Sequence, residues 1–79
     1  MTLGACVDSL EAAVLDLDAQ ADLAEERRRA DAAWRLDVAR GVARAALQVV
    51  HDEARDQWER IGYATSALET IAGHRAAAA

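Results

Sequence analysis

The chain lacks lysine, proline and phenylalanine, and Cys6 is its single cysteine. A lone cysteine excludes a disulfide within the chain, and a domain of this size buries only about 60% of its unfolded surface. The longest purely apolar runs have four residues, whereas ~20 are needed to span a bilayer. No segment has the pattern of a secretory signal peptide. We therefore predict a soluble protein in the reducing cytoplasm, with no membrane association.

The abundant residues favour helices. The sequence has 21 alanines and nine arginines, and both residue types rank among the best helix formers. β-branched residues are sparse, and no segment alternates apolar and polar residues with the period of two that marks a strand. Apolar residues recur instead at steps of three and four, which predicts an all-α fold.

The first helix is predicted from a heptad-like run of apolar residues between Leu3 and Ala24. Asp8 and Glu11 form a capping box ahead of most of this run, so the helix is expected over residues 8–28. Two positions are open for the turn that follows. Asp31 can cap a new helix after a turn at 28–31, and Gly41 is the alternative break. The turn at 28–31 is favoured because it leaves two helices of matched length.

A second apolar run predicts a helix over residues 31–61, with Trp58 on its buried side. Gly62 marks a kink or an end, and a capping box at Ser66 and Glu69 predicts a short helix over 66–75. The closing Ala76–Ala79 run is expected to lack structure. The predicted architecture is one helical domain, an antiparallel hairpin with a short C-terminal helix, completed to a bundle by dimerisation.

Charge is distributed unevenly along the chain, whose net charge is −5. Residues 1–26 hold seven acidic side chains and no basic one, and residues 27–46 hold six arginines against two acids. One interpretation is that the acidic helix folds back onto the basic one. The other is an exposed acidic strip for a basic partner, made of Glu11, Asp18, Asp22 and Glu25. The net negative charge argues against direct nucleic-acid binding.

Both long helices carry a second apolar stripe away from the main one. On the first helix it contains Leu15 and Leu23, and on the second it contains Trp34, Val38, Val42 and Val49. A two-helix hairpin buries one stripe per helix, so the second stripe needs another cover. A second copy of the chain, a different protein or a third helix that folds back can provide it. We favour self-association or a protein partner, and hence a homodimer.

No motif with specific chemistry is present, and we predict no enzymatic activity, no metal and no cofactor. His51 and Glu53 are two residues apart and point to different sides of a helix, so they cannot chelate a metal together. Cys6 and His74 have no local partner that activates them, and Cys6 lies on the apolar side of the first helix. The arginines are the one group that can still surround an anion, with Arg29, Arg40 and Arg44 on one helix face.

Family patterns of small helical proteins are not met. Dimeric chorismate mutases use an early arginine and a lysine, whereas the first arginine here is Arg27 and lysine is absent. The Trp-x-Gly turn of secreted WXG hairpins would need glycine at the position of Leu36. Type III secretion co-chaperones, phage anti-CRISPR proteins and antitoxins are similar only in size, charge and helicity.

The sequence thus favours a small acidic inhibitor or adaptor that docks on a basic protein surface through helix faces. A phage or mobile-element inhibitor of a nucleic-acid-binding complex, anti-CRISPR-like or antitoxin-like, is the most concrete form of this hypothesis. The alternative is a secretion co-chaperone or a structural helical subunit.

Overall fold

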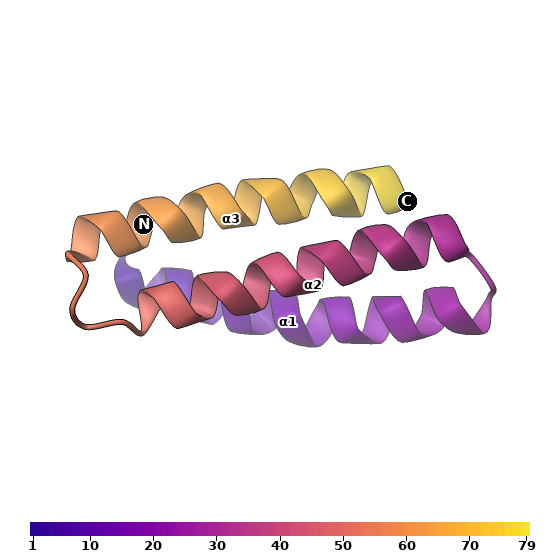
Figure 1. The fold of residues 1–79 in the computed structure, drawn as a ribbon, viewed down its shortest axis with the longest axis horizontal. Coiled ribbons are helices and arrows are strands. Elements are labelled where there is room, and N and C mark those ends of the chain that lie inside the picture. The colour runs from indigo at the N-terminus through magenta and orange to yellow at the C-terminus, as the bar shows by residue number, and fades with distance from the viewer.

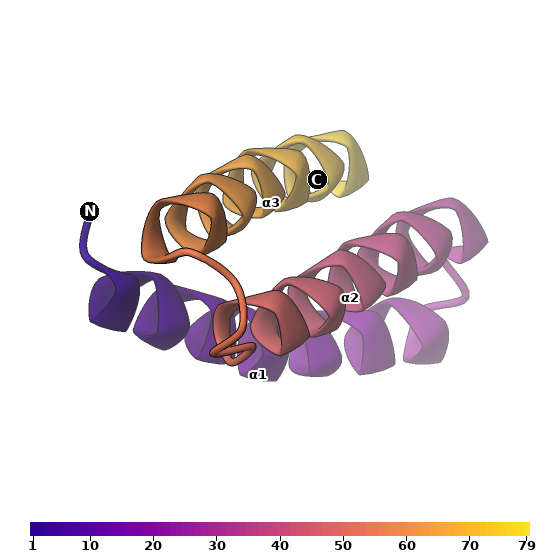
Figure 2. The ribbon, with the colours of Figure 1, turned by 60° about the vertical axis from the view of Figure 1, so that its left-hand side comes forward.

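A computed structural model, which describes residues 1–79, contains three helices: α1 (Leu3–Glu26), α2 (Ala30–Val50) and α3 (Gln57–Ala78). Consecutive helices are antiparallel and form an elongated bundle of 42 × 17 × 17 Å (Figure 1). The turned view shows that the helices do not lie in one layer, so each contributes to a shared interior (Figure 2). The prediction of an all-α fold is confirmed. The hairpin of α1 and α2 is present, but α3 is a full-length third helix.

α1 begins earlier than the sequence signals predict. Its N-cap is Thr2, whose hydroxyl accepts a hydrogen bond from the amide of Ala5 at 3.1 Å. Asp8 and Glu11, the predicted capping box, lie inside the helix. Threonine is a good N-cap residue, and the apolar spacing already begins at Leu3, so the earlier start keeps more of that spacing helical.

The turn between α1 and α2 lies at residues 27–29 and closes with Arg28 in the left-handed conformation, at φ 55°. The amide of Arg28 donates to the carbonyl of Glu25, and the amide of Arg29 donates to the carbonyl of Ala24 at 2.9 Å. These two bonds form a Schellman motif, which usually has glycine at the left-handed position. The arginine there carries a backbone strain that glycine would not.

The second connection corrects the predicted helix over 31–61. α2 ends at Val50, and residues 51–56 form a loop that leads into α3. Asp56 caps α3 by accepting from the amide of Trp58 at 3.2 Å. The guanidinium of Arg60 reaches back and donates to the carbonyl of Val50 at 3.1 Å, which satisfies one free carbonyl at the end of α2. The predicted seam is therefore broken at the loop, and Trp58 is exposed.

The C-terminal half of the chain also differs from the prediction of a short helix over 66–75. Gly62 lies inside α3 without ending it, as Gly41 lies inside α2. The alanine tail is helical through Ala78, which is buried, and Arg29 donates a hydrogen bond to the carbonyl of that residue at 3.0 Å. Packing against the turn explains why the tail has structure.

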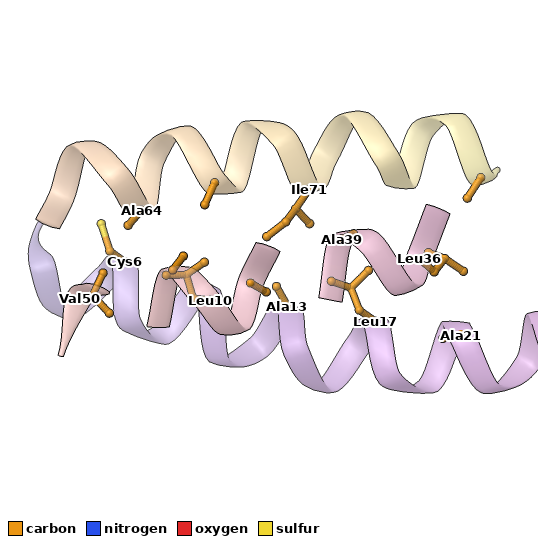
Figure 3. Close-up of a cluster of buried hydrophobic side chains, with 14 of the residues drawn as sticks. Cys6, Leu10, Ala13, Leu17, Ala21, Leu36, Ala39, Val50, Ala64 and Ile71 are labelled. Carbon is orange, nitrogen blue, oxygen red and sulfur yellow. The ribbon is translucent and has the colours of Figure 1, made fainter. Parts of the chain in front are cut away.

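The core between the three helices is built largely of small side chains. Leu10 and Leu17 of α1, Val50 of α2 and Ile71 of α3 supply the larger buried groups, together with Cys6 (Figure 3). The other buried residues are Ala13, Ala21, Ala24, Ala32, Leu36, Ala39, Ala43, Ala46, Ala64, Ala67 and Ala78. Alanine at the contact positions allows helix axes to approach closely. The prediction that Cys6 is buried is confirmed.

Candidate protein-binding surfaces

The two sides of α2 differ in the size of their apolar side chains. Four of the six buried residues of α2 are alanines, and the other two are Leu36 and Val50. The opposite side carries Trp34, which is 60% exposed, and Val38 and Val49, which are half-buried. Ordinary amphipathic helices place the larger apolar groups inside, so α2 has an unusual distribution.

We define the α2 stripe as the outward-facing residues Trp34, Val38, Gly41, Ala45 and Val49, which follow one another at steps of four, three, four and four. No charged residue belongs to this stripe. The guanidinium of Arg35 lies 5.2 Å from the centre of the Trp34 ring, within the range of a cation–π contact. The stripe spans about 22 Å along the helix axis.

Val42, predicted with this set, lies at its margin and packs partly against the core. α3 folds back onto the bundle, as one of the alternatives held, but it leaves Trp34 exposed. The third helix therefore leaves Trp34, the largest member of the stripe, uncovered.

α1 has an outward face of a different kind. Leu15 is 73% exposed and Leu23 is 44% exposed, so the second stripe predicted for this helix also lies on the surface. We define the α1 acidic face as the exposed carboxylates around Leu15: Asp8, Glu11, Asp22 and Glu26. None of these four takes part in an ion pair.

The carboxylate of Asp18, also on α1, is paired within the bundle instead. Asp18 accepts from Arg40 at 3.2 Å and from Arg44 at 3.3 Å, so it joins α1 to α2. Hydrogen bonds to Asp37 and Asp18 raise the pKa of the Arg40 guanidinium above its ordinary value. The acidic helix thus folds back onto the basic one at Asp18. Of the predicted strip, Glu11, Asp22 and Glu25 remain exposed and unpaired.

α3 joins α1 through a similar ion pair. Asp16 of α1 accepts from Arg75 near the end of α3. Sequence reasoning did not single out this pair, because the residues are 59 positions apart and only the fold brings them together.

Two aromatic residues on α3 were also missed as surface groups. Trp58 is 70% exposed and Tyr63 is 46% exposed. Trp58 continues the spacing of three and four that the apolar residues of α2 follow, so this spacing gave no sign of the loop before Trp58. The acidic and polar run from His51 to Asp56 was the available signal for a break.

The bundle gathers no set of three or more histidine, cysteine or carboxylate side chains that can hold a metal ion. Arg29, Arg40 and Arg44, considered as an anion site, already donate to oxygens of the chain. His51 is exposed, and His74 has a buried Nδ1 atom without a hydrogen-bond partner.

None of the three helices combines the length and apolar character needed to cross a membrane. Comparison with protein-family models, with curated proteins and with solved structures finds no match to this chain.

Proposed function

We propose that this chain is a non-enzymatic protein-binding module, an inhibitor or adaptor that docks through the outward faces of α2 and α1. One observation carries the proposal: α2 buries alanines and leaves Trp34 and its neighbours on the surface. A protein-binding surface accounts for that arrangement, because exposed apolar side chains concentrated on one face are typical of contact sites.

The exposed part of the stripe is large enough to matter energetically. Covering the exposed part of the Trp34 ring removes on the order of 100 Å² from water, worth about 2–3 kcal/mol. That amount is a large fraction of the stability of a domain this small. A partner that also covers Val38 and Val49 gains a smaller contribution from each, because both valines are already half-buried.

The α1 acidic face supplies the second part of the proposal. Its unpaired carboxylates favour a partner with a basic surface, because complementary charges accelerate association and align the two proteins. A nucleic-acid-binding protein offers such a surface. An inhibitor of the anti-CRISPR or antitoxin kind, encoded by a phage or mobile element, is the most specific form of the proposal.

A second candidate is a secretion co-chaperone or a structural helical subunit. The ion pairs of Asp18 favour it, because they show that part of the predicted acidic strip serves the fold. In this alternative the α2 stripe alone carries the contact, and the remaining carboxylates only keep the protein hydrated.

Site-specific photo-crosslinking tests the proposal. A photoreactive amino acid replaces Ala45, within the α2 stripe, or Gly73, an exposed residue of α3. We expect adducts with protein from position 45 and none from position 73. An absence of adducts from position 45 and from position 15 on α1 would contradict the proposal.

The two candidates differ in their dependence on charge. Once a crosslinked partner is identified, the substitutions Glu11→Arg and Asp22→Arg should slow its association and flatten the salt dependence if the acidic face contributes. An unchanged rate and salt slope would favour the co-chaperone or structural alternative.

A further inference from the structure

We infer that the α2 stripe pairs with the α2 stripe of a second copy in an antiparallel arrangement, with the two-fold axis opposite the Arg40–Gly41 peptide. The inference rests on the proposed role of the α2 stripe as a contact surface and names its occupant. Two independent features select this arrangement: the order of the side-chain sizes along the stripe and the position of the charged residues on its flank.

Side-chain size changes along the stripe. The bulkiest group, Trp34, and Val38 lie in its first half, whereas Gly41 and Ala45 follow. With the axis opposite Arg40–Gly41 and a rise of about 1.5 Å per residue, Trp34 of one copy lies between Ala45 and Val49 of the other. Val38 lies between Gly41 and Ala45 of the second copy. Large groups thus meet small ones, which is the requirement of knobs-into-holes packing.

A parallel pair would not have this fit. It would place Trp34 against Trp34, which crowds one end of the contact. A parallel two-fold also exchanges the flanks of the two helices, so Asp37 and Arg44 of one copy would lie on the flank away from Asp37 and Arg44 of the other, and no ion pair between the copies would form.

The charges on the flank of the stripe fit the antiparallel pair. Asp37 and Arg44 lie on the same side of α2, each about 5 Å along the axis from the proposed two-fold. Antiparallel pairing therefore sets Asp37 of each copy opposite Arg44 of the other, twice. Their side chains are 68% and 58% exposed, so both are accessible for a second pair beside their present ones with Arg40 and Asp18.

Gly41 supports a close approach at the two-fold. It lies in the middle of α2, where glycine destabilises a helix by roughly 1 kcal/mol relative to alanine. A Cβ atom added there would meet nothing within 4 Å in the single chain. The same is true of Gly62 and Gly73 in α3, so the open space alone does not single out Gly41; it leaves room for a second helix to cross closely there.

The dimer leaves the α1 acidic faces uncovered. α1 contributes nothing to the proposed contact, so each copy presents its carboxylates outward. The dimer is then bivalent toward a basic partner, and two linked contacts bind more tightly than one. The contact involves one helix per copy and is small for a specific interface, so we expect a weak dimer that forms at micromolar concentrations.

Sedimentation equilibrium of the full chain over a range of concentrations tests the inference. We expect a monomer–dimer equilibrium whose dissociation constant rises at least about tenfold for Gly41→Leu, because a leucine at the crossing separates the helices. Gly73→Leu is the matched control, since it makes the same change at an exposed helical glycine with open space around it. That variant should dimerise like the original chain, and both should remain fully helical by circular dichroism.

Exchanging the charges of Asp37 and Arg44 then tests whether the two α2 helices are antiparallel. Asp37→Arg and Arg44→Asp should each weaken the dimer several-fold, and the double variant should recover most of the loss, because it restores opposite charges across the antiparallel pair. Within one chain the two residues form no direct ion pair but share a network through Arg40 and Asp18, so unfolding of each variant as a dilute monomer is the control that separates coupling within the chain from recovery of the dimer. A failure of the double variant to recover, or a dimer unaffected by Gly41→Leu, would overturn the inference. A chain that stays monomeric throughout would also overturn it, and crosslinks from Ala45 to another protein would then still support the proposed function.

Discussion

The inner and outer sides of α2 are both apolar, but they are built for different neighbours. The inner side uses alanines such as Ala39, Ala43 and Ala46, which are fully buried and let α1 and α3 approach closely. The outer side uses a tryptophan and valines around one glycine and one alanine. Burial of small groups gives the bundle its compact core, whereas exposure of large ones leaves a surface that a single chain does not cover. The inner side of the helix packs the fold, and we propose that the outer side serves recognition.

The largest expected effect tests the inner side. Ala43→Leu adds a bulky group where no space exists, and we expect it to destabilise the bundle by about 1–3 kcal/mol. Ala45→Leu makes the same change two residues later on the exposed side, and it should alter the free energy of unfolding of the monomer by less than about 0.5 kcal/mol. Urea denaturation at low protein concentration measures both. Equal losses would remove the distinction between the two sides.

The turn that precedes α2 offers a test with the opposite sign. Arg28→Gly relieves the left-handed backbone at that position, and we expect a stabilisation of about 1 kcal/mol. The same denaturation measurement applies, with Arg27→Gly as the control, since Arg27 has an ordinary negative φ of −86°. If Arg28→Gly lowered the free energy of unfolding, the left-handed conformation of Arg28 would not cost the bundle stability.

The charges of α1 allow a parallel comparison of inner and outer carboxylates. Asp18→Asn weakens the pairs with Arg40 and Arg44, and we expect a loss of about 0.5–1 kcal/mol, limited by the partial exposure of these groups. Asp22→Asn, one helical turn away and unpaired, should be neutral within error. Thermal unfolding at low and high salt separates them, because only the Asp18 difference should shrink as salt rises. A larger effect from Asp22 would mean that the outer carboxylates stabilise the fold.

The smallest effect on stability is expected on the outer side. Val38→Ala should change the free energy of unfolding of the dilute monomer by less than about 0.5 kcal/mol, since its side chain is not among those packed against the core. Its effect should grow with protein concentration if the α2 stripe is covered in an assembly, because binding stabilises the bound form. Unfolding midpoints measured over a hundredfold range of concentration give the comparison. An effect that is large in the dilute monomer would place Val38 in the core.

The helical content could be predicted from the sequence because apolar residues recur at steps of three and four from Leu3 onward. The end of α2 did not follow, because Ala54 and Trp58 keep the same phase across the loop and neither glycine nor proline marks it. Asp52 accepts from the amide of Ala54 within the loop, and Asp56 accepts from the amide of Trp58 at the start of α3. Acidic residues also occur on the exposed surface of a helix. Local spacing does not distinguish the two roles.

The candidate surfaces could be predicted in part from the sequence. Trp34 and Leu15 fall outside the main stripes of their helices by spacing alone, and both are exposed in the structure. Asp18 belongs to the same acidic run as Asp22, and only the antiparallel packing of α2 decides which of them meets an arginine. Partner assignment across helices depends on register, which the spacing within one helix does not determine.

The accessibility of Trp34 tests the central claim most directly. In a Trp58→Phe chain Trp34 is the only tryptophan, and acrylamide quenching of its fluorescence reports how far the ring is open to solvent. The account predicts strong quenching in the dilute chain and protection as concentration rises through the micromolar range. Trp34→Phe is the matched control, because Trp58, which is 70% exposed, should stay equally accessible at every concentration. Quenching of Trp34 that stays constant with concentration and upon addition of a crosslinked partner would contradict the assignment of the outer side of α2 to recognition.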